Sequence, residues 1–182
     1  MSTKKRMNKK FELTKETNKV GGVTLFRIRA LVDLKFCKKG ELGGWIESEK
    51  NLSVSGNAWV SGDARVFGNA CVYGNARVYG NAWVYGYARV YGYAWVYDNA
   101  WVCGDARVCG NARVSDNAWV CGDARVYGNA CVYGDARVFG KIKLKTYLCS
   151  RFSFEYKWQL DLWFKKEAEF LAEVEKRKKA KK

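Results

Sequence analysis

Valine occupies every sixth residue from Val54 to Val138, fifteen times in succession. An alanine stands two residues before each of these valines from Ala58 to Ala136, and the repeated phrase is Gly-Asn/Asp-Ala-x-Val-x. A period of six matches neither the 3.6-residue turn of a helix nor the two-residue alternation of a flat strand. It is typical of a chain that turns a corner every six residues and stacks one coil on the next. The repeat therefore predicts a β-solenoid, whose function depends on what its outer faces display.

Each repeat predicts a short strand followed by a corner. Side chains alternate along a strand, so the alanine and valine of Ala-x-Val-x point inward and the two x residues point outward. The Gly-Asn or Gly-Asp pair that follows tolerates the backbone angles of a corner. The core is therefore uniform, and chemical variety is left to the outward positions.

The repeat resembles that of the hexapeptide-repeat proteins, which place an aliphatic residue at every sixth position and a small residue two positions before it. This resemblance covers residues 54–144 and implies a left-handed, triangular parallel β-helix with three repeats in each coil of eighteen residues. The left hand comes from the resemblance alone, since crossover connections ordinarily favour the right hand. Residues 54–143 would then form about five coils and a prism about 24 Å tall, at about 4.8 Å per coil.

Coils of eighteen residues sort the outward residues that precede each valine into three faces of different chemistry. The alternating face has Trp59, Arg77, Trp95, Arg113 and Cys131. The tryptophan face has Arg65, Trp83, Trp101, Trp119 and Arg137. The basic face has Cys71, Arg89, Arg107, Arg125 and Lys143. Coils of twelve residues would mix these columns, so the pattern favours three sides over two.

The flanks of the repeat have to cover the open ends of the stack, where strand edges and apolar core would otherwise be exposed. We expect an all-β solenoid with four parts: a disordered basic arm at 1–9, an N-terminal cap at 10–50, the β-helix at 51–145, and a C-terminal cap with a strand, a helix and a basic tail at 146–182. Within the first cap, the residues around Gly21-Gly22 predict a β-hairpin.

A second resemblance concerns the start of the solenoid. The stretch Leu-Gly-Gly-Trp-Ile-Glu at 42–47 and Asn-Leu-Ser at 51–53, followed by Gly-Asn-Ala repeats, looks like a family of β-solenoid proteins encoded by phages and prophages. It covers residues 10–140 and implies expression in a bacterial host cell, during infection or from a prophage. No apolar run is long enough to cross a membrane, and the basic start lacks the apolar region of a signal peptide. We therefore expect a cytoplasmic protein.

The net charge of +15 resides in the flanks. Residues 1–50 and residues 141–182 each contribute +7, whereas residues 51–140 contribute only +1. Such an excess indicates an anionic partner such as nucleic acid or a host nucleoprotein. Alternatively, it serves only to keep the solenoid soluble.

The basic face is the first candidate binding site. Stacked guanidinium groups about 5 Å apart repel one another and require nearby anions, and tyrosines beside them can stack on bases. An acidic protein surface is a second candidate ligand, and pairing with the neighbouring Asp105 and Asp123 would leave no site at all. The predicted site consists of Arg89, Arg107, Arg125, Lys143, Tyr73, Tyr91 and Tyr127, together with Lys176, Arg177, Lys178 and Lys179 of the basic tail.

The tryptophan face is the second candidate. Trp83, Trp101 and Trp119, with Phe67 and Phe139 in the adjoining column, form a surface too apolar to remain in contact with water. The face predicts a protein interface, either with a partner or within a dimer or trimer. Alternatively, a C-terminal helix covers it with Trp163, Phe164 and Leu171. On the alternating face, the Trp and Arg residues predict a cation–π ladder.

Catalysis has little support. The chain has no histidine, the residue that most often serves as general base or metal ligand near neutral pH. Asp98 and Asp116 replace corner glycines, which a left-handed backbone explains better than a bound cation. The seven cysteines include no Cys-x-x-Cys pair, and we expect reduced thiols, Cys103 and Cys121 on neighbouring coils included. The sequence therefore predicts no enzyme, cofactor, metal or small-molecule substrate.

The sequence as a whole predicts a non-enzymatic binding protein. The first hypothesis is a phage-encoded accessory factor that docks on nucleic acid or a host nucleoprotein, and inhibits a defence nuclease in the manner of anti-CRISPR proteins. The alternative is a structural or assembly protein that oligomerises, or attaches to a larger particle, through the tryptophan face.

Overall fold

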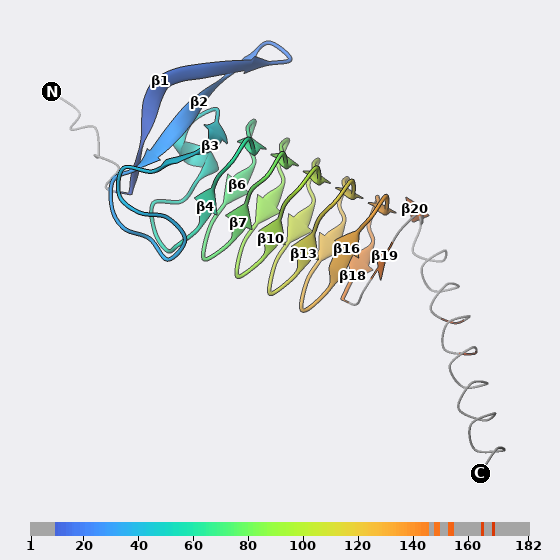
Figure 1. Ribbon diagram of the computed structural model, residues 1–182. Helices are drawn as coiled ribbons and strands as arrows, with labels where there is room; N and C mark the ends of the chain where they lie inside the picture. Colours follow the sequence, from blue (N-terminus) through green and yellow to red (C-terminus); the bar gives the residue numbers. More distant parts are fainter. Residues whose placement is uncertain (1–9, 146–147, 150–152, 155–164, 166–168, 170–182) are drawn as a thin grey trace, which may run out of the picture.

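The computed structural model describes residues 10–145, 148–149, 153–154, 165 and 169. Figure 1 shows a regular stack of coils that continues from an antiparallel hairpin near the N-terminus. The arm predicted at 1–9 and the basic-tail residues Lys176, Arg177, Lys178 and Lys179 lie outside the described residues, as does most of the predicted C-terminal cap. No helix within the described part is both long and apolar enough to cross a bilayer.

Three sheets of short parallel strands form the walls of the solenoid, as the sequence predicts. The first wall contains β3 (Leu42–Ile46), β5 (Arg65–Val66), β8 (Trp83–Val84), β11 (Trp101–Val102), β14 (Trp119–Val120), β17 (Arg137–Val138) and β20 (Ser153–Phe154). The second contains β4 (Trp59–Val60), β7 (Arg77–Val78), β10 (Trp95–Val96), β13 (Arg113–Val114), β16 (Cys131–Tyr133) and β19 (Leu148–Cys149). The third contains β6 (Cys71–Val72), β9 (Arg89–Val90), β12 (Arg107–Val108), β15 (Arg125–Val126) and β18 (Lys143–Leu144).

The register of the walls confirms coils of eighteen residues. Within the perfect repeat, each strand pairs with the strand eighteen residues later, as Trp95 does with Arg113. The ends of the stack depart from this spacing: Trp45 pairs with Arg65, twenty residues on, and Arg137 pairs with Ser153, sixteen residues on. The second wall has six strands, so the stack has about six coils rather than the five counted from perfect repeats. The left-handed sense of the coil stays a prediction.

The core is a column of alanine and valine side chains that the solvent does not reach. Every alanine and valine of the repeat from Ala58 to Val138 is at most 1 % exposed. Gly80 shows why the corners require glycine: its φ is +69°, and an added Cβ would lie 2.9 Å from the backbone nitrogen of Asp98 in the next coil. Asp98 and Asp116 adopt the same left-handed backbone, with φ of 56°, which explains their presence at glycine positions.

Side-chain amides at the corners form ladders along the stack. In the longest, Asn81 donates to Asn99, Asn99 donates to Asn117, and Asn117 donates to Asp135, over 3.1 to 3.4 Å. These corner positions also bond through the backbone, and the amide of Asn81 donates to the carbonyl of Asp98 at 2.8 Å. The corner residue of the repeat therefore has a second role beyond tolerating a turn, since it ties one coil to the next.

A hairpin covers the first coil, as predicted. Strands β1 (Phe11–Val20) and β2 (Val23–Ala30) pair antiparallel, and β2 then pairs antiparallel with β3. Phe11 and Ile28 are fully buried and close the apolar end of the stack. A short 3₁₀ helix, η1 (Glu49–Asn51), follows β3.

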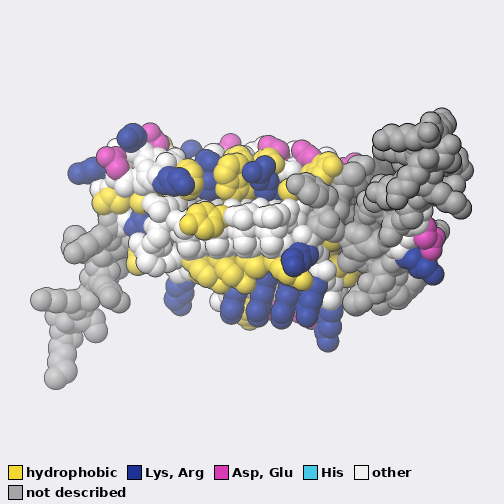
Figure 2. Space-filling view, turned by 90° about the horizontal axis from the view of Figure 1, so that it is seen from below, with side chains coloured by type: hydrophobic (Ala, Val, Ile, Leu, Met, Phe, Trp, Pro, Cys, Tyr) yellow, Lys and Arg dark blue, Asp and Glu magenta, His cyan; other side chains and the backbone are white. Residues whose placement is uncertain are grey.

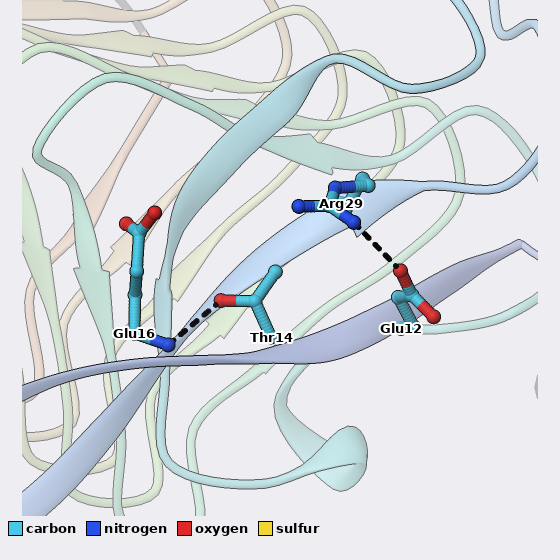
Figure 3. Close-up of polar contacts among 4 residues, drawn as sticks. All are labelled: Glu12, Thr14, Glu16 and Arg29. Carbon is cyan, nitrogen blue, oxygen red and sulfur yellow. Dashed lines mark hydrogen bonds and ion pairs between the residues drawn. The ribbon is translucent and has the colours of Figure 1, made fainter.

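Polar contacts lie along the first half of β1, as Figure 3 shows. Arg29 on β2 pairs with Glu12 on β1 at 3.3 Å. The backbone nitrogen of Glu16 donates to the hydroxyl of Thr14 at 3.2 Å, within the segment where the register of β1 shifts against β2. The side chain of Thr14 thus satisfies a backbone donor at the irregularity.

Candidate functional site

The basic face forms one continuous column on the third wall. Strand pairing places Arg89, Arg107, Arg125 and Lys143 at the same register position of successive strands. Three of these side chains are exposed and that of Arg107 is half-buried. The prediction that these residues share one wall is therefore confirmed. Figure 2 shows Lys and Arg side chains standing in a row along one long edge of the molecule, beside a strip of hydrophobic side chains.

No carboxylate forms an ion pair with this column within the described residues. The ion pairs found there join Arg27 to Asp63, Arg29 to Glu12 and Lys165 to Glu169. The local alternative from the sequence, in which Asp105 and Asp123 pair with the arginines that follow them, is not realised. Two unit charges 4 to 5 Å apart repel by about 1 kcal/mol in bulk water. The column is therefore a line of mutually repelling cations that bound anions would stabilise.

Two shallow grooves border the column, and they differ in charge. The carboxylate groove, of about 380 Å³, is lined by Asp105, Arg107, Asp123, Arg125, Lys141 and Lys143. The tyrosine groove, of about 270 Å³, is lined by Tyr91, Arg107, Cys109, Arg125, Tyr127 and Lys143. The second groove has three cations and no acidic residue in its lining. It is thus the side of the column that best accommodates an anion.

The predicted tyrosines lie on the same wall, but two of them already have partners. The rings of Tyr73 and Tyr91 stack on each other, with centroids 4.8 Å apart and planes 3° from parallel. Burial raises the pKa of the Tyr73 hydroxyl above its usual value. A hydrogen bond with the side chain of Cys109, and then burial, raise the pKa of Tyr91. Both hydroxyls therefore stay protonated at neutral pH, and the ring faces of this pair are partly used within the protein.

Two further tyrosines were not among the predicted site residues. Tyr87 and Tyr93 occupy corners on either side of β9, and they are 61 % and 56 % exposed. The sequence does contain a signal for them, because all the other corner residues from Asn57 to Asp135 are asparagine or aspartate. Unlike Asp98 and Asp116, these two tyrosines do not stand at the left-handed positions of the corners.

The tryptophan face is a continuous aromatic stack on the first wall. The rings of Trp83 and Trp101 are 5.1 Å apart, and those of Trp101 and Trp119 are 4.8 Å apart, nearly parallel in both cases. Arg65 lies 5.1 Å from the ring of Trp83, and Arg137 lies 5.2 Å from the ring of Trp119. The three tryptophans are half-buried, so stacking and the terminal arginines cover part of their apolar surface.

The column beside the tryptophans has aromatic residues at both ends. Phe67 stacks on Tyr85 at 5.2 Å, and Phe139, further along, is half-buried. The prediction that Trp163, Phe164 and Leu171 cover this face concerns residues outside the described part of the chain.

The same column contains a disulfide that the sequence interpretation did not expect. Cys103 and Cys121 are bonded through their sulfur atoms, and their Cα atoms are 4.6 Å apart. The expectation of two reduced thiols is therefore wrong for this structure. The physical reason is the register, because identical positions of adjacent coils lie within the Cα separation that a disulfide can bridge.

The alternating face forms the predicted cation–π ladder. The guanidinium groups of Arg77 and Arg113 lie 5.3 and 5.0 Å from the ring of Trp95, one on each neighbouring strand. Trp59, at the start of this column, is buried. The arginine charges of the alternating face thus contact an aromatic ring of the same face, whereas those of the basic face have no such partner among the described residues.

Comparison with known proteins finds a similarity for three stretches of the repeat. Residues 70–86, 106–122 and 118–134 match the family model described as YdcK Beta solenoid repeat. No curated protein matches the chain. The matched stretches lie within the coils whose register is described above. The chain is therefore a β-solenoid protein, and these three stretches of it are similar to the YdcK β-solenoid repeat.

Proposed function

We propose that this protein is a non-enzymatic binding protein that docks on nucleic acid, free or within a host nucleoprotein, through its basic face. The observation that carries the proposal is the column of Arg89, Arg107, Arg125 and Lys143, which has no carboxylate partner within the described residues. Phosphates spaced along a nucleic-acid strand would relieve the repulsion within this column and release their own counterions.

The charge of the grooves supports a defined position for the ligand. The tyrosine groove offers three cations without a carboxylate, whereas Asp105 and Asp123 line the opposite side of the column. A phosphate backbone is therefore favoured on the tyrosine side, since the two carboxylates offset part of the positive charge on the other. An acidic protein surface would meet the same charges, but it lacks nucleobases that could stack on the aromatic rings beside them.

Fluorescence polarisation with a labelled 20-nucleotide strand, between 50 and 200 mM salt, tests the proposal. The variant with Arg107→Gln and Arg125→Gln should bind at least about tenfold more weakly, and its salt slope should fall by about 0.7 to 0.9 for each phosphate that it no longer binds. A matched control replaces Lys15 and Lys19, two exposed lysines of the hairpin, with glutamine. No binding at 50 mM salt, binding that ignores salt, or an equal loss in the control would contradict the proposal.

The origin and the biological target form a finer part of the same proposal. The strict period of six and the three-sided coil support kinship with the hexapeptide-repeat proteins, and the residues 42–53 support a phage or prophage origin. A surface that docks on nucleic acid or nucleoprotein suits an inhibitor of a host defence nuclease in the bacterial cytoplasm. If expression of the protein fails to protect an invading phage in a host with an active defence nuclease, this part is wrong.

The exposed remainder of the tryptophan face supports a second function, assembly into a dimer, trimer or larger particle. Trp83, Trp101 and Trp119 are only half-buried, and tryptophan is favoured at protein interfaces. If the labelled strand does not bind and light scattering gives a mass above that of the monomer, assembly replaces nucleic-acid binding as the better account. A monomer that binds the strand excludes it.

A further inference from the structure

Two corners of the solenoid break the rule that the other corners follow. Tyr87 and Tyr93 stand where the repeat otherwise places asparagine or aspartate, from Asn57 to Asp135. Neither tyrosine takes part in the side-chain ladder bonds described between the coils. Asparagines on either side of Tyr93 in its column form ladder bonds, Asn57 with Asn75 at 3.0 Å and Asn111 with Asn129 at 3.1 Å, and Tyr93 interrupts that ladder.

Both tyrosines border the basic face in a single coil. They flank β9, whose outward residue Arg89 belongs to the cation column. Being six residues apart, Tyr87 and Tyr93 are separated by at most about 20 Å. They are the two most exposed aromatic residues described, at 61 % and 56 %. An exposed ring at the border of a cation column is an available stacking surface.

The two borders are not equivalent. Tyr93 lies two residues after Tyr91, which lines the tyrosine groove, and its column neighbours are Asn75 and Asn111. Tyr87 lies on the border that continues into Asp105 and Asp123 of the carboxylate groove. A phosphate backbone that avoids the two carboxylates therefore passes beside Tyr93.

Resting on the function proposed above, we infer that the ligand of the basic face is a single-stranded nucleic acid, with one base stacked on the ring of Tyr93. Its phosphates lie along Arg107, Arg125 and Lys143 on the tyrosine side of the column. A duplex satisfies the cations but not the ring, because its bases are stacked and paired with one another. An unpaired strand satisfies both, since every base has a face that can stack on an aromatic side chain.

The test compares four labelled ligands of the same length: dT12, U12, a twelve-residue abasic strand with the same phosphates, and a 12-base-pair duplex. The variant Tyr93→Asn restores the residue that the repeat uses at this corner, so the fold is preserved. It should bind dT12 and U12 about tenfold more weakly, which is the effect of losing one stacked base. Its affinity for the abasic strand and the duplex should stay as in the wild type.

Tyr87→Asn is the matched control, because it removes an equally exposed tyrosine from the other border of the same coil. It should leave the affinity for dT12 and U12 within about twofold of the wild type. A comparison of dT12 with U12 shows whether DNA or RNA is preferred.

The outcomes separate the inference from the function on which it rests. Equal wild-type binding of dT12 and the abasic strand, with no effect of Tyr93→Asn, overturns the stacking inference and leaves the basic face as a phosphate site. A loss in Tyr87→Asn but not in Tyr93→Asn also overturns it, because the strand then follows the other border. No binding of any of the four ligands at low salt overturns both.

Discussion

Among single residues, Lys10 is unusual because its charge is buried at the junction of the hairpin and the first coil. Its side chain is 3 % exposed, and its Nζ donates to the carbonyl of Ser53 at 2.8 Å. Burial lowers the pKa of Lys10 from 10.5 to about 8, against a smaller opposing effect of Cys37. Between these two values, the unfolded chain binds more protons than the folded one. The contribution of Lys10 to stability therefore rises with pH across this window.

Replacing Lys10 with methionine should remove this pH dependence. The free energy of unfolding of the wild type, minus that of Lys10→Met, should increase as the pH is raised from about 8 towards 10.5. Urea unfolding at several pH values in this range measures the difference, with Lys50→Met as a control at an exposed lysine. Parallel profiles for the wild type and Lys10→Met would show that Lys10 keeps an ordinary pKa.

At the scale of the elements, two-residue strands gain support from ladders of side chains that run across them. Asn99 is in the middle of the longest amide ladder, since it accepts from Asn81 at 3.3 Å and donates to Asn117 at 3.4 Å. These bonds add to a backbone ladder that already joins each coil to the next. The stability of each short strand therefore depends more on hydrogen bonds to the strands above and below it than on its own length.

The variant Asn99→Ala should lower the free energy of unfolding by about 1 kcal/mol, because two exposed hydrogen bonds between side-chain amides are lost. Asn69→Ala is the matched control, at a corner whose side chain makes no ladder bond within the described residues. Thermal unfolding of both variants provides the comparison. Equal losses at the two corners would mean that the ladder contributes nothing beyond corner propensity.

The period of the sequence was enough to predict the walls, their register and the residues that share each face. Eighteen residues per coil places Arg89, Arg107 and Arg125 in one column, and strand pairing confirms it. The additional coils at the ends were not predictable in this way. There β3 and β20 pair at spacings of twenty and sixteen residues, where backbone pairing continues after the side-chain pattern has stopped.

Other features of the site depend on distances that a pattern does not contain. The disulfide of Cys103 and Cys121 follows from a Cα separation of 4.6 Å, whereas composition had favoured reduced thiols. The sequence pattern likewise did not predict that the rings of Tyr73 and Tyr91 stack on each other. Tyr93, by contrast, was present in the sequence as a break in the repeat. Assigning Tyr93 to the binding site also required the positions of the two grooves, which the repeat does not contain.

At the scale of the whole molecule, the solenoid is a linear array in which each coil contacts the coils next to it. The stability of such an array is approximately the sum of the intrinsic stabilities of its coils and the interaction free energies between neighbouring coils. A covalent bond between two coils therefore stabilises one interface directly. The Cys103–Cys121 disulfide joins consecutive coils over a sequence separation of 18 residues, near the middle of the stack.

Replacing Cys103 and Cys121 together with serine should lower the free energy of unfolding by about 3 kcal/mol, the value for closing a loop of this size. Denaturant unfolding under oxidising conditions measures the effect, and the wild type with a reductant should behave like the double variant. Cys131→Ser, at a free half-buried cysteine on another wall, is the control. A wild type that is indifferent to the reductant would contradict the covalent link.

The constant length of the coil has a consequence for how such a protein can change its ligand. Because each coil adds one residue to the cation column, the span of that column is counted in coils, at about 4.8 Å apiece. Gain or loss of eighteen codons would lengthen or shorten the track by one step, and the neighbouring coils would still meet partners of the same shape. Ligand length is thus encoded in gene length, separately from the side chains that determine affinity.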